Sequence, residues 1–248
     1  GFPIEINENM FTGAALADFN GDELDDIVIA TDSDNLYLYN NDGELFTGFP
    51  FHAGDGFRSA PIITNVNGDE NLEILVGNDD GKLYCINTDG SLNFYYHSGF
   101  QIRTSPGVLE YDEMLFIVYG DNNGMIYMID AVGSLVEGWP LQFSQGIYSS
   151  PLVADLDSDG SPEIISAAKS GEYIILNMTG AHYFDSQLSS NQITEGQATI
   201  SDFDQDGDVD IFIGNQAGLD GLDIKTGSTS GLWSIFRGNN QRTGFFMR

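Results

Sequence analysis

Basic side chains are scarce in this chain of 248 residues, and their scarcity excludes several functions at once. Eight Lys and Arg residues stand against 38 acidic ones, which gives a formal charge of −30 and a pI near 4.1. Nucleic acids and anionic membrane surfaces both need cationic side chains for binding, so we expect neither partner. Long apolar runs are also lacking. The longest, from Met114 to Tyr119, is far shorter than a membrane span, so no membrane insertion is expected.

Cysteine is nearly absent, because Cys85 stands alone. A single cysteine rules out an internal disulfide and a cluster of thiolate zinc ligands. The catalytic fingerprints of serine hydrolases, zinc proteases, phosphate loops and dinucleotide-binding folds are missing as well. Acids abundant enough for a glycosidase-like pair are present, but we expect a protein that is not an enzyme. Disorder is excluded, since 41% of the residues are hydrophobic, including 17 Phe and 11 Tyr.

The sequence repeats itself. Four acidic segments of nine residues begin at Asp18, Asn65, Asp155 and Asp202, at intervals of 47, 90 and 47 residues. The interval of 90 contains one further repeat in which the acidic segment is shortened to about Glu110–Glu113. Five repeats therefore cover the chain, approximately residues 1–47, 48–94, 95–137, 138–184 and 185–248.

Each repeat has a β pattern of four short strands separated by turns rich in Gly, Asp and Asn. Apolar residues recur at equivalent positions of the repeats, and Cys85 lies in one such column, which predicts a core residue and not a nucleophile. Repeats too small to bury their own faces indicate a β-propeller with four-stranded antiparallel blades, forming a single domain over residues 1–248. Small residues on the first strands suit the innermost position. The aligned apolar columns are Leu38, Cys85, Met128 and Ile175, and Tyr39, Ile86, Ile129 and Leu176.

The acidic segments predict calcium sites. They place oxygen-bearing side chains at positions 1, 3, 5 and 9, and a backbone carbonyl at position 7 suits the same ion, because calcium takes six to eight oxygen ligands. A solvated Asp/Gly turn is the alternative for a single copy, but repeated copies argue against it. An EF-hand is excluded, since position 12 holds Ile29, Ser166 and Ile213 in place of Glu.

The loop pattern, preceded by Gly13-Ala14-Ala15, Ala60-Pro61 or Ser150-Pro151, resembles the FG-GAP repeat of integrin α-chains and VCBS-type proteins. The junctions Gly1-Phe-Pro3, Gly48-Phe-Pro50 and Gly138-Trp-Pro140 are similar to those of its bacterial secreted branch. The resemblance implies a calcium-binding propeller on an extracellular or cell-surface protein. Propellers of that kind usually have seven blades, so the five repeats either close a small ring or are a fragment of a six- to eight-bladed propeller.

Carried over by position, the resemblance implies three calcium sites and a weaker fourth. The fourth has Asn in place of two acids. The implied ligands are Asp18, Asn20, Asp22, the Leu24 carbonyl and Asp26; Asp155, Asp157, Asp159, the Ser161 carbonyl and Glu163; Asp202, Asp204, Asp206, the Asp208 carbonyl and Asp210; and, in the weaker site, Asn65, Asn67, Asp69, Asn71 and Glu73.

Partners are expected on the face opposite the calcium loops, by the same resemblance. An aligned column before each first strand varies between repeats, as either a recognition surface or unconstrained loops would: Phe11, Arg58, Arg103, Tyr148, Glu195 and Arg242. Turns between the second and third strands add Asp32, Asp34, Asp79, Asp80, Asp121 and Lys169.

Three functions follow as hypotheses. The first is a non-catalytic interaction or adhesion module, monomeric within a larger secreted or surface protein. The second is a glycan-binding propeller in which Phe11, Phe57 and Tyr148 stack on sugars. The third is a structural spacer of a larger secreted enzyme. The four loops hold 17 of the 38 acids, so the charge points to metal binding more than to a partner.

Overall fold

The fold was analysed in a computed structural model that describes residues 1–69, 71–184, 189–225 and 243–246. These residues form strands, turns and bends without any helix, so no membrane-spanning helix is found among them. The chain divides into two compact parts. The first part comprises residues 1–106 and 241–248, and the second part comprises residues 107–240. That all five repeats form one domain stays a prediction.

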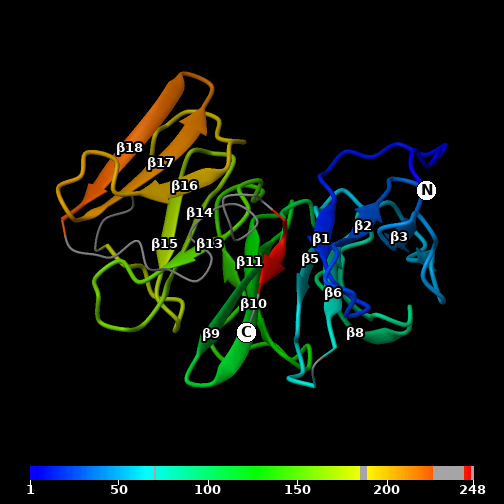
Figure 1. The fold of residues 1–248 in the computed structure, drawn as a ribbon. Helices are drawn as coiled ribbons and strands as arrows, with labels where there is room; N and C mark the ends of the chain where they lie inside the picture. The colour runs from blue at the N-terminus through cyan, green and yellow to red at the C-terminus, as the bar shows by residue number, and fades with distance from the viewer. Residues whose placement is uncertain (70, 185–188, 226–242, 247–248) are drawn as a thin grey trace. The chain divides into compact units, whose positions relative to one another are not determined.

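The first part holds two sheets (Figure 1). The sheet of repeat one has four strands in the order of the chain, and the sheet of repeat two has four such strands and a fifth, β19, on its inner edge. Sequential antiparallel pairing of this kind is the blade of a propeller. The strands are β1 (Ala15–Ala17), β2 (Asp26–Ala30), β3 (Asn35–Tyr39) and β4 (Phe51–His52), then β5 (Ile62–Thr64), β6 (Glu73–Gly77), β7 (Lys82–Asn87) and β8 (Leu92–His97).

The second part holds three sheets, again with strands in chain order. Repeat three forms a complete four-stranded blade, and repeats four and five have three described strands each. The fourth strand expected in repeat five falls outside the described residues. The strands are β9 (Gly107–Tyr111), β10 (Met114–Gly120), β11 (Met125–Asp130) and β12 (Leu141–Gln142); β13 (Leu152–Ala154), β14 (Glu163–Ala167) and β15 (Tyr173–Leu176); and β16 (Ala198–Ser201), β17 (Val209–Asn215) and β18 (Gly218–Ile224).

The repeat columns define the core as predicted. Leu38, Cys85, Met128 and Ile175 each face an apolar partner on the second strand, namely Val28, Leu75, Val118 and Ile165. All four column residues are buried. Cys85 is a core side chain, and burial raises the pKa of its thiol far above the ordinary value, which removes the thiolate that a nucleophile needs.

The repeat junctions lie inside the blades, not between them. Strand β4 at Phe51–His52 completes the first blade, although the sequence boundary was set at residue 47. Gly48, with a φ of 95°, comes so close to the Asp89–Gly90 turn that a Cβ would lie 1.9 Å from the Asp89 carbonyl oxygen. Glycine is required there by both conformation and space, which explains its recurrence before the Phe-Pro and Trp-Pro pairs.

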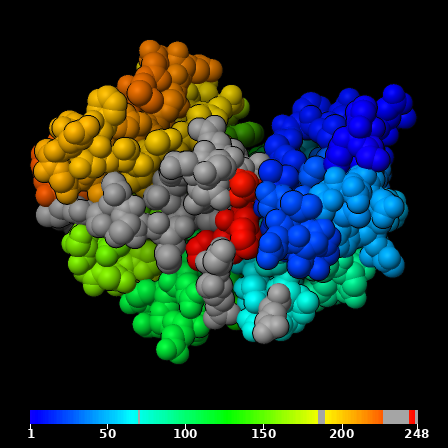
Figure 2. Space-filling model, in the orientation of Figure 1, coloured from blue at the N-terminus to red at the C-terminus, as the bar shows by residue number. Residues whose placement is uncertain are grey.

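Strand β19 (Phe245–Phe246) pairs in parallel with β5, in contrast to the antiparallel pairs elsewhere. The Ile63 N–H donates to the Gly244 carbonyl at 2.5 Å, and the Leu16 N–H donates to the Thr243 carbonyl at 2.9 Å. The C-terminal residues shown in red therefore lie against the innermost strands of both blades of the first part (Figures 1 and 2). Phe246 is buried in this position.

Candidate metal loops and the opposite turns

Each acidic loop connects the first strand of a blade to the second. Position 9 of the loop pairs across the sheet with the last residue of the first strand, so its side chain is fixed by the strand ladder. The pairs are Ala17–Asp26, Thr64–Glu73, Ala154–Glu163 and Ser201–Asp210. Position 9 is buried in all four loops, whereas positions 3 and 5 are exposed at the loop tip in all four.

Three hydrogen bonds recur in every loop. The N–H of position 2 donates to the carboxylate of position 9 at 2.7–2.9 Å. The N–H of position 5 donates to the side-chain oxygen of position 3, and the N–H of position 7 donates to that of position 5. These bonds aim the side chains inward and use one oxygen of each. The second oxygen differs from loop to loop: Asn41 donates to that of Asp22, and the Asn67 amide donates to that of Asp69.

The loop backbone turns sharply at two places. In loops one, four and five, positions 4 and 6 have left-handed φ values, as in Ser158 and Gly160 of loop four, with φ of 59° and 88°. Two left-handed residues two apart curl the chain so that its side chains and N–H groups point to one centre. Glycine is common at both positions for this reason, but Ser158, Gln205 and Glu23 show that other residues are accepted.

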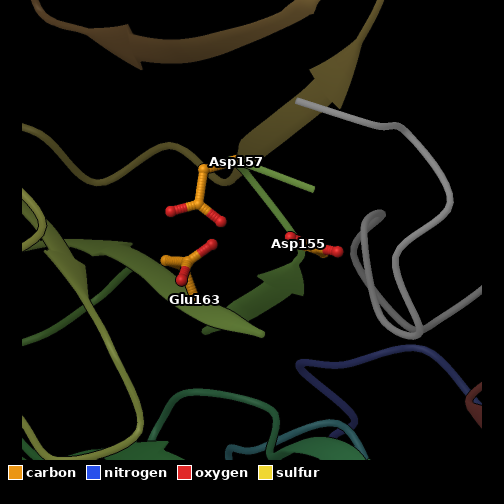
Figure 3. A group of neighbouring side chains, drawn as sticks. All are labelled: Asp155, Asp157 and Glu163. Carbon is orange, nitrogen blue, oxygen red and sulfur yellow. The ribbon is translucent and has the colours of Figure 1, made fainter. Parts of the chain in front are cut away.

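Loop four brings three carboxylates together. Oxygen atoms of Asp155, Asp157 and Glu163 all lie within 4.8 Å of one another. Figure 3 shows the Asp157 and Glu163 carboxylates turned toward each other, with Asp155 at the end of β13 beside them. Burial, together with the nearby Asp side chains, raises the pKa of Glu163 to about 7. Three acids this close repel one another, so the group has the character of a cation site.

Loop five forms a second group from Asp202, Asp204 and Asp206. One oxygen of Asp202 is buried and has no hydrogen-bond donor among the described residues, as expected for an oxygen that faces a metal ion. Lys225 on the neighbouring turn reaches this loop, with its Nζ 3.3 Å from Asp206 and 2.5 Å from Asp223. Its cation compensates part of the charge at the outer side of the loop.

Loop one does not bring three carboxylates together as loops four and five do, although Asp18 is bound as Asp155 of loop four is, whose two oxygens accept the N–H groups of Asp159 and Gly160. Both Asp18 oxygens accept backbone N–H groups, at 2.7–3.2 Å, and these bonds outweigh desolvation and lower the pKa of Asp18. The second oxygen of Asp22 accepts a bond from Asn41 at 2.7 Å. Asp26 keeps one buried oxygen without a donor among the described residues, and burial raises its pKa. The predicted ligands Asn20 and Leu24 lie in the loop, exposed.

Loop two replaces part of its charge with an amide. The Asn67 side-chain oxygen accepts the Asp69 N–H, which turns its NH₂ group toward two acids, Asp69 at 3.1 Å and Glu73 at 3.4 Å. Asn65 accepts the Gly68 N–H at 2.5 Å. An amide donor therefore lies where loop four presents a carboxylate oxygen. Burial raises the pKa of Glu73, as it raises that of Glu163.

Metal coordination by the position 7 carbonyls of Leu24, Asn71, Ser161 and Asp208 stays a prediction, as does ligation by Asp159 and Asp210. Repeat three has no loop. Tyr111 pairs with Met114 across a hairpin whose turn is Asp112–Glu113, with φ of 52° and 63°. Two acidic groups able to hold a metal ion are thus found among the described residues, in loops four and five.

On the other side of the blades, residues of the varying column contact the turns between the second and third strands of repeats two and four. Asp79 lies between two arginines of the column, with Arg58 Nε at 3.3 Å and Arg103 bound through Nε at 3.0 Å and Nη2 at 3.2 Å. The Arg58 guanidinium also lies 4.8 Å from the ring centre of Phe11, which is 61% exposed. These arginines are held in place, not extended freely into solvent.

The second part repeats this arrangement with the charges reversed. Lys169 lies on the turn, with its Nζ 2.7 Å from Glu195 and 4.8 Å from the ring centre of Tyr148. The column thus links successive repeats through a turn residue of opposite charge. Where the turn residue is acidic, the column residues are basic, and where the turn residue is Lys169, the column residue is Glu195. This opposite charge is a signal in the sequence that indicates the pairing. Arg242 lies outside the described residues, and Phe57, proposed to stack on sugars, is fully buried and does not reach a ligand.

Comparisons with known families agree with this architecture. Residues 18–76 match the FG-GAP-like repeat, and residues 52–145 match the lambda-carrageenase beta-propeller domain. The resemblance of the repeats to FG-GAP is therefore confirmed, and the fold is of the β-propeller type. No curated protein matches the chain.

Solved structures share the fold at low sequence identity. The V. cholerae biofilm matrix protein Bap1 matches with a TM-score of 0.67 and 17% identity over 94% of this chain and 40% of its own. BamB from Moraxella catarrhalis matches with a TM-score of 0.63 and 15% identity over 93% of this chain and 65% of its own. BBS1N, crystallised in complex with ARL6DN, matches with a TM-score of 0.59 and 18% identity over 92% of this chain and 69% of its own. The chain therefore spans less than two thirds of the Bap1 and BamB chains.

Proposed function

We propose that the chain is a calcium-stabilised propeller module that binds a partner, without catalysis, as part of an extracellular or cell-surface protein. The observation that carries the calcium proposal is loop four, where oxygens of three carboxylates lie within 4.8 Å of one another. Hard oxygen ligands in a flexible loop favour calcium over the softer transition metals, which prefer nitrogen and sulfur. The unpaired buried oxygens of Asp26 and Asp202 support the same reading in loops one and five.

The ion has a structural task in this proposal. It neutralises the loop and joins the first strand of the blade to the second, because its ligands come from both ends of the connection. Extracellular calcium modules bind with dissociation constants of roughly 0.1–1 mM, and an ion at ten times that concentration adds about 1.4 kcal/mol per site. Several such sites are a large share of the stability of an ordinary domain.

The test is thermal unfolding with and without the ion. We expect calcium to raise the melting temperature by several degrees over a chelated sample, and magnesium to raise it less. Asp157→Asn combined with Asp155→Asn should reduce the effect of calcium, whereas Asp42→Asn, an exposed acid outside the loops, should leave it intact. Melting curves that are identical in calcium and after exhaustive chelation contradict the proposal.

The binding role has support from proteins of the same fold. One structural relative is a biofilm matrix protein and another was crystallised with a protein partner. The arginines held by Asp79 and the exposed Phe11 ring offer a polar and aromatic surface on the turns opposite the metal loops. A pull-down with the native protein, compared with Arg103→Ala and Phe11→Ala, tests whether this surface is used. Equal capture by all three proteins contradicts it.

A glycan ligand is the second candidate, and one observation favours it. A polar cavity of about 540 Å³ adjoins loop two and is lined by amides and carboxylates, with Asn67, Asn87 and Asn93 among them. The family match to a carrageenase propeller domain agrees with a carbohydrate environment. The formal charge of −30 favours neutral sugars. A glycan array that is negative in calcium-containing buffer argues against it, and binding abolished by Asn93→Ala supports it.

A further inference from the structure

The blade without a metal loop has an apolar cavity instead. A cavity of about 490 Å³ in the second part lies beside the short hairpin of repeat three, with mainly apolar walls. Its volume is in the range of small-ligand sites. The lining comes from the hairpin, from the segment leading to Trp139 and from the next turn along the chain: Tyr111, Asp112, Met114, Phe116, Val136, Glu137, Gly138, Met178 and Thr179.

Strand register relates this cavity to the metal loops. Phe116 pairs with Asp130 as Glu73 pairs with Asn87, so Phe116 occupies the place of the buried position 9 acid. The turns that follow match as well, since the Asp130 N–H bonds to Ser134 as the Asn87 N–H bonds to Ser91. This alignment puts Val136 at the place of Asn93, which lines the polar cavity beside loop two. Hydrocarbon therefore replaces the oxygen-bearing side chains at both places.

The walls of the cavity are fixed by the fold. The Trp139 Nε1–H donates to the Met178 carbonyl at 3.2 Å, which holds the far wall against the segment that contains Val136. The Tyr111 hydroxyl lies 3.3 Å from that of Ser161 in loop four. The near wall is open, because the hairpin is short and Met114 is 56% exposed. A preformed cavity with an open apolar side is suited to receiving a side chain from outside.

Charge around the cavity points to the kind of partner. Residues 104–168 contain ten acids and no Lys or Arg, and Asp112 and Glu137, both exposed, lie at the cavity itself. A negative rim of this kind attracts a basic ligand and repels an acidic one.

We propose that this cavity binds one large apolar side chain of a partner protein, presented on a segment with Lys or Arg on both sides. The apolar side chain fills the space next to Phe116 and Val136, and the flanking cations face Asp112 and Glu137. Such a buried anchor inside a polar rim is the usual arrangement of an interaction hot spot. The inference goes beyond the proposed function and requires no calcium, so either can fail alone.

Fluorescence anisotropy with labelled pentapeptides tests the proposal. We expect Lys-Lys-Phe-Lys-Lys to bind the intact chain, and Lys-Lys-Ala-Lys-Lys and Glu-Glu-Phe-Glu-Glu to bind about tenfold more weakly or not at all. Affinity for the first peptide should fall with ionic strength, because the rim charges are exposed. Equal affinity for the Phe and Ala peptides overturns the proposal, since it leaves only non-specific attraction to an acidic surface. No binding of any peptide overturns it as well.

Variants place the peptide in the cavity. Val136→Asn, which restores the side chain of repeat two, should weaken Lys-Lys-Phe-Lys-Lys about fivefold or more. Val132→Asn is the matched control, because Val132 is exposed in the adjacent turn and does not line the cavity. Melting curves of both variants report whether the fold is intact. Equal effects of the two variants overturn the assignment, as does sedimentation showing a dimer of the chain that Val136→Asn dissociates, which makes a second copy the occupant.

Discussion

Loop two and loop four share the three recurring hydrogen bonds and differ in chemistry. Both contain the bond from the position 2 N–H to the position 9 acid, at 2.8 Å for Val66 to Glu73 and 2.7 Å for Leu156 to Glu163. Loop four adds Asp155 and Asp157, where loop two has Asn65 and Asn67. These shared hydrogen bonds therefore form with either set of side chains. Position 3 decides whether an oxygen or an amide faces the two acids.

The bond that both loops share should have the largest effect when it is broken. In Glu163→Ala and Glu73→Ala, a buried backbone N–H loses its acceptor, which costs about 1–3 kcal/mol of unfolding free energy. Urea unfolding in chelator measures this without any contribution from bound metal. Glu163→Gln and Glu73→Gln are the controls, since Gln keeps an acceptor oxygen. If the alanine variants are as stable as the glutamine variants, the bond from the position 2 N–H to the position 9 side chain does not stabilise either loop.

Exchanging the side chains that differ should exchange metal affinity. We expect Asn65→Asp with Asn67→Asp to give loop two calcium binding, and Asp155→Asn with Asp157→Asn to weaken loop four. Each carboxylate should change affinity by roughly tenfold, or about 1.4 kcal/mol. Isothermal titration calorimetry measures the number of sites and their affinities. An unchanged number of sites after both exchanges contradicts the role given to positions 1 and 3.

Acid titration should separate the two loops further. The pKa of Glu163 is raised to about 7 by burial and by three neighbouring Asp side chains, whereas Asp69 alone contributes in this way to the raised pKa of Glu73. A raised carboxyl pKa means that the protonated form is favoured by folding. Its stabilisation is complete below the unfolded-state pKa, near 4.5, and is lost as the pH rises through about 7.

The measurement is the melting temperature of chelated protein between pH 4.5 and pH 7.5. Stability should fall over this range, and Glu163→Gln should flatten the fall more than Glu73→Gln does. If the melting temperature falls equally steeply in the native protein and in Glu163→Gln, a group other than Glu163 causes the loss of stability.

The smallest effect is expected from the backbone itself. Position 4 is Gly68 in loop two and Ser158 in loop four, with φ of 78° and 59°. Ser158→Gly removes the conformational strain of a side chain in the left-handed region, which stabilises the folded state by about 1–2 kcal/mol. It also gives the unfolded chain more conformational entropy, which destabilises the folded state by about 0.5–1 kcal/mol. We expect a net change in urea unfolding of about 1 kcal/mol or less. A larger change indicates that loop shape, and not charge, separates the two loops.

The repeats, the strand pattern and the core columns were predictable from the sequence, because equivalent residues recur at fixed spacing. Cys85 was placed in the core by its column alone, and it is buried there. Phe57 was predicted to reach a ligand and is buried, since sequence position does not reveal which side of a short bridge faces the core. Strand β4 lies past the predicted end of repeat one because two-residue strands have no periodicity to detect.

The positions of the metal loops were predictable from the sequence, but the hydrogen bonds inside each loop were not. Whether Asn67 turns its oxygen or its NH₂ group inward depends on the Asp69 N–H, which claims the oxygen. The pairing of Asp79 with Arg58 and Arg103 joins residues from three different turns, so the opposite charges of turn and column hint at it in the sequence, but the structure is needed to show which residues meet. Contacts between repeats are not encoded in the spacing within one repeat.

The parallel pairing of β19 with β5 has a consequence for how the protein folds during synthesis. Phe245 and Ile63 are about 180 residues apart, so their contact has a very long sequence separation and forms late. Until the ribosome has made residues 243–246, the inner edge of β5 exposes unpaired N–H and C=O groups. A nascent chain at that stage is open to pairing with another extended segment, which makes chaperone protection of the early blades an advantage.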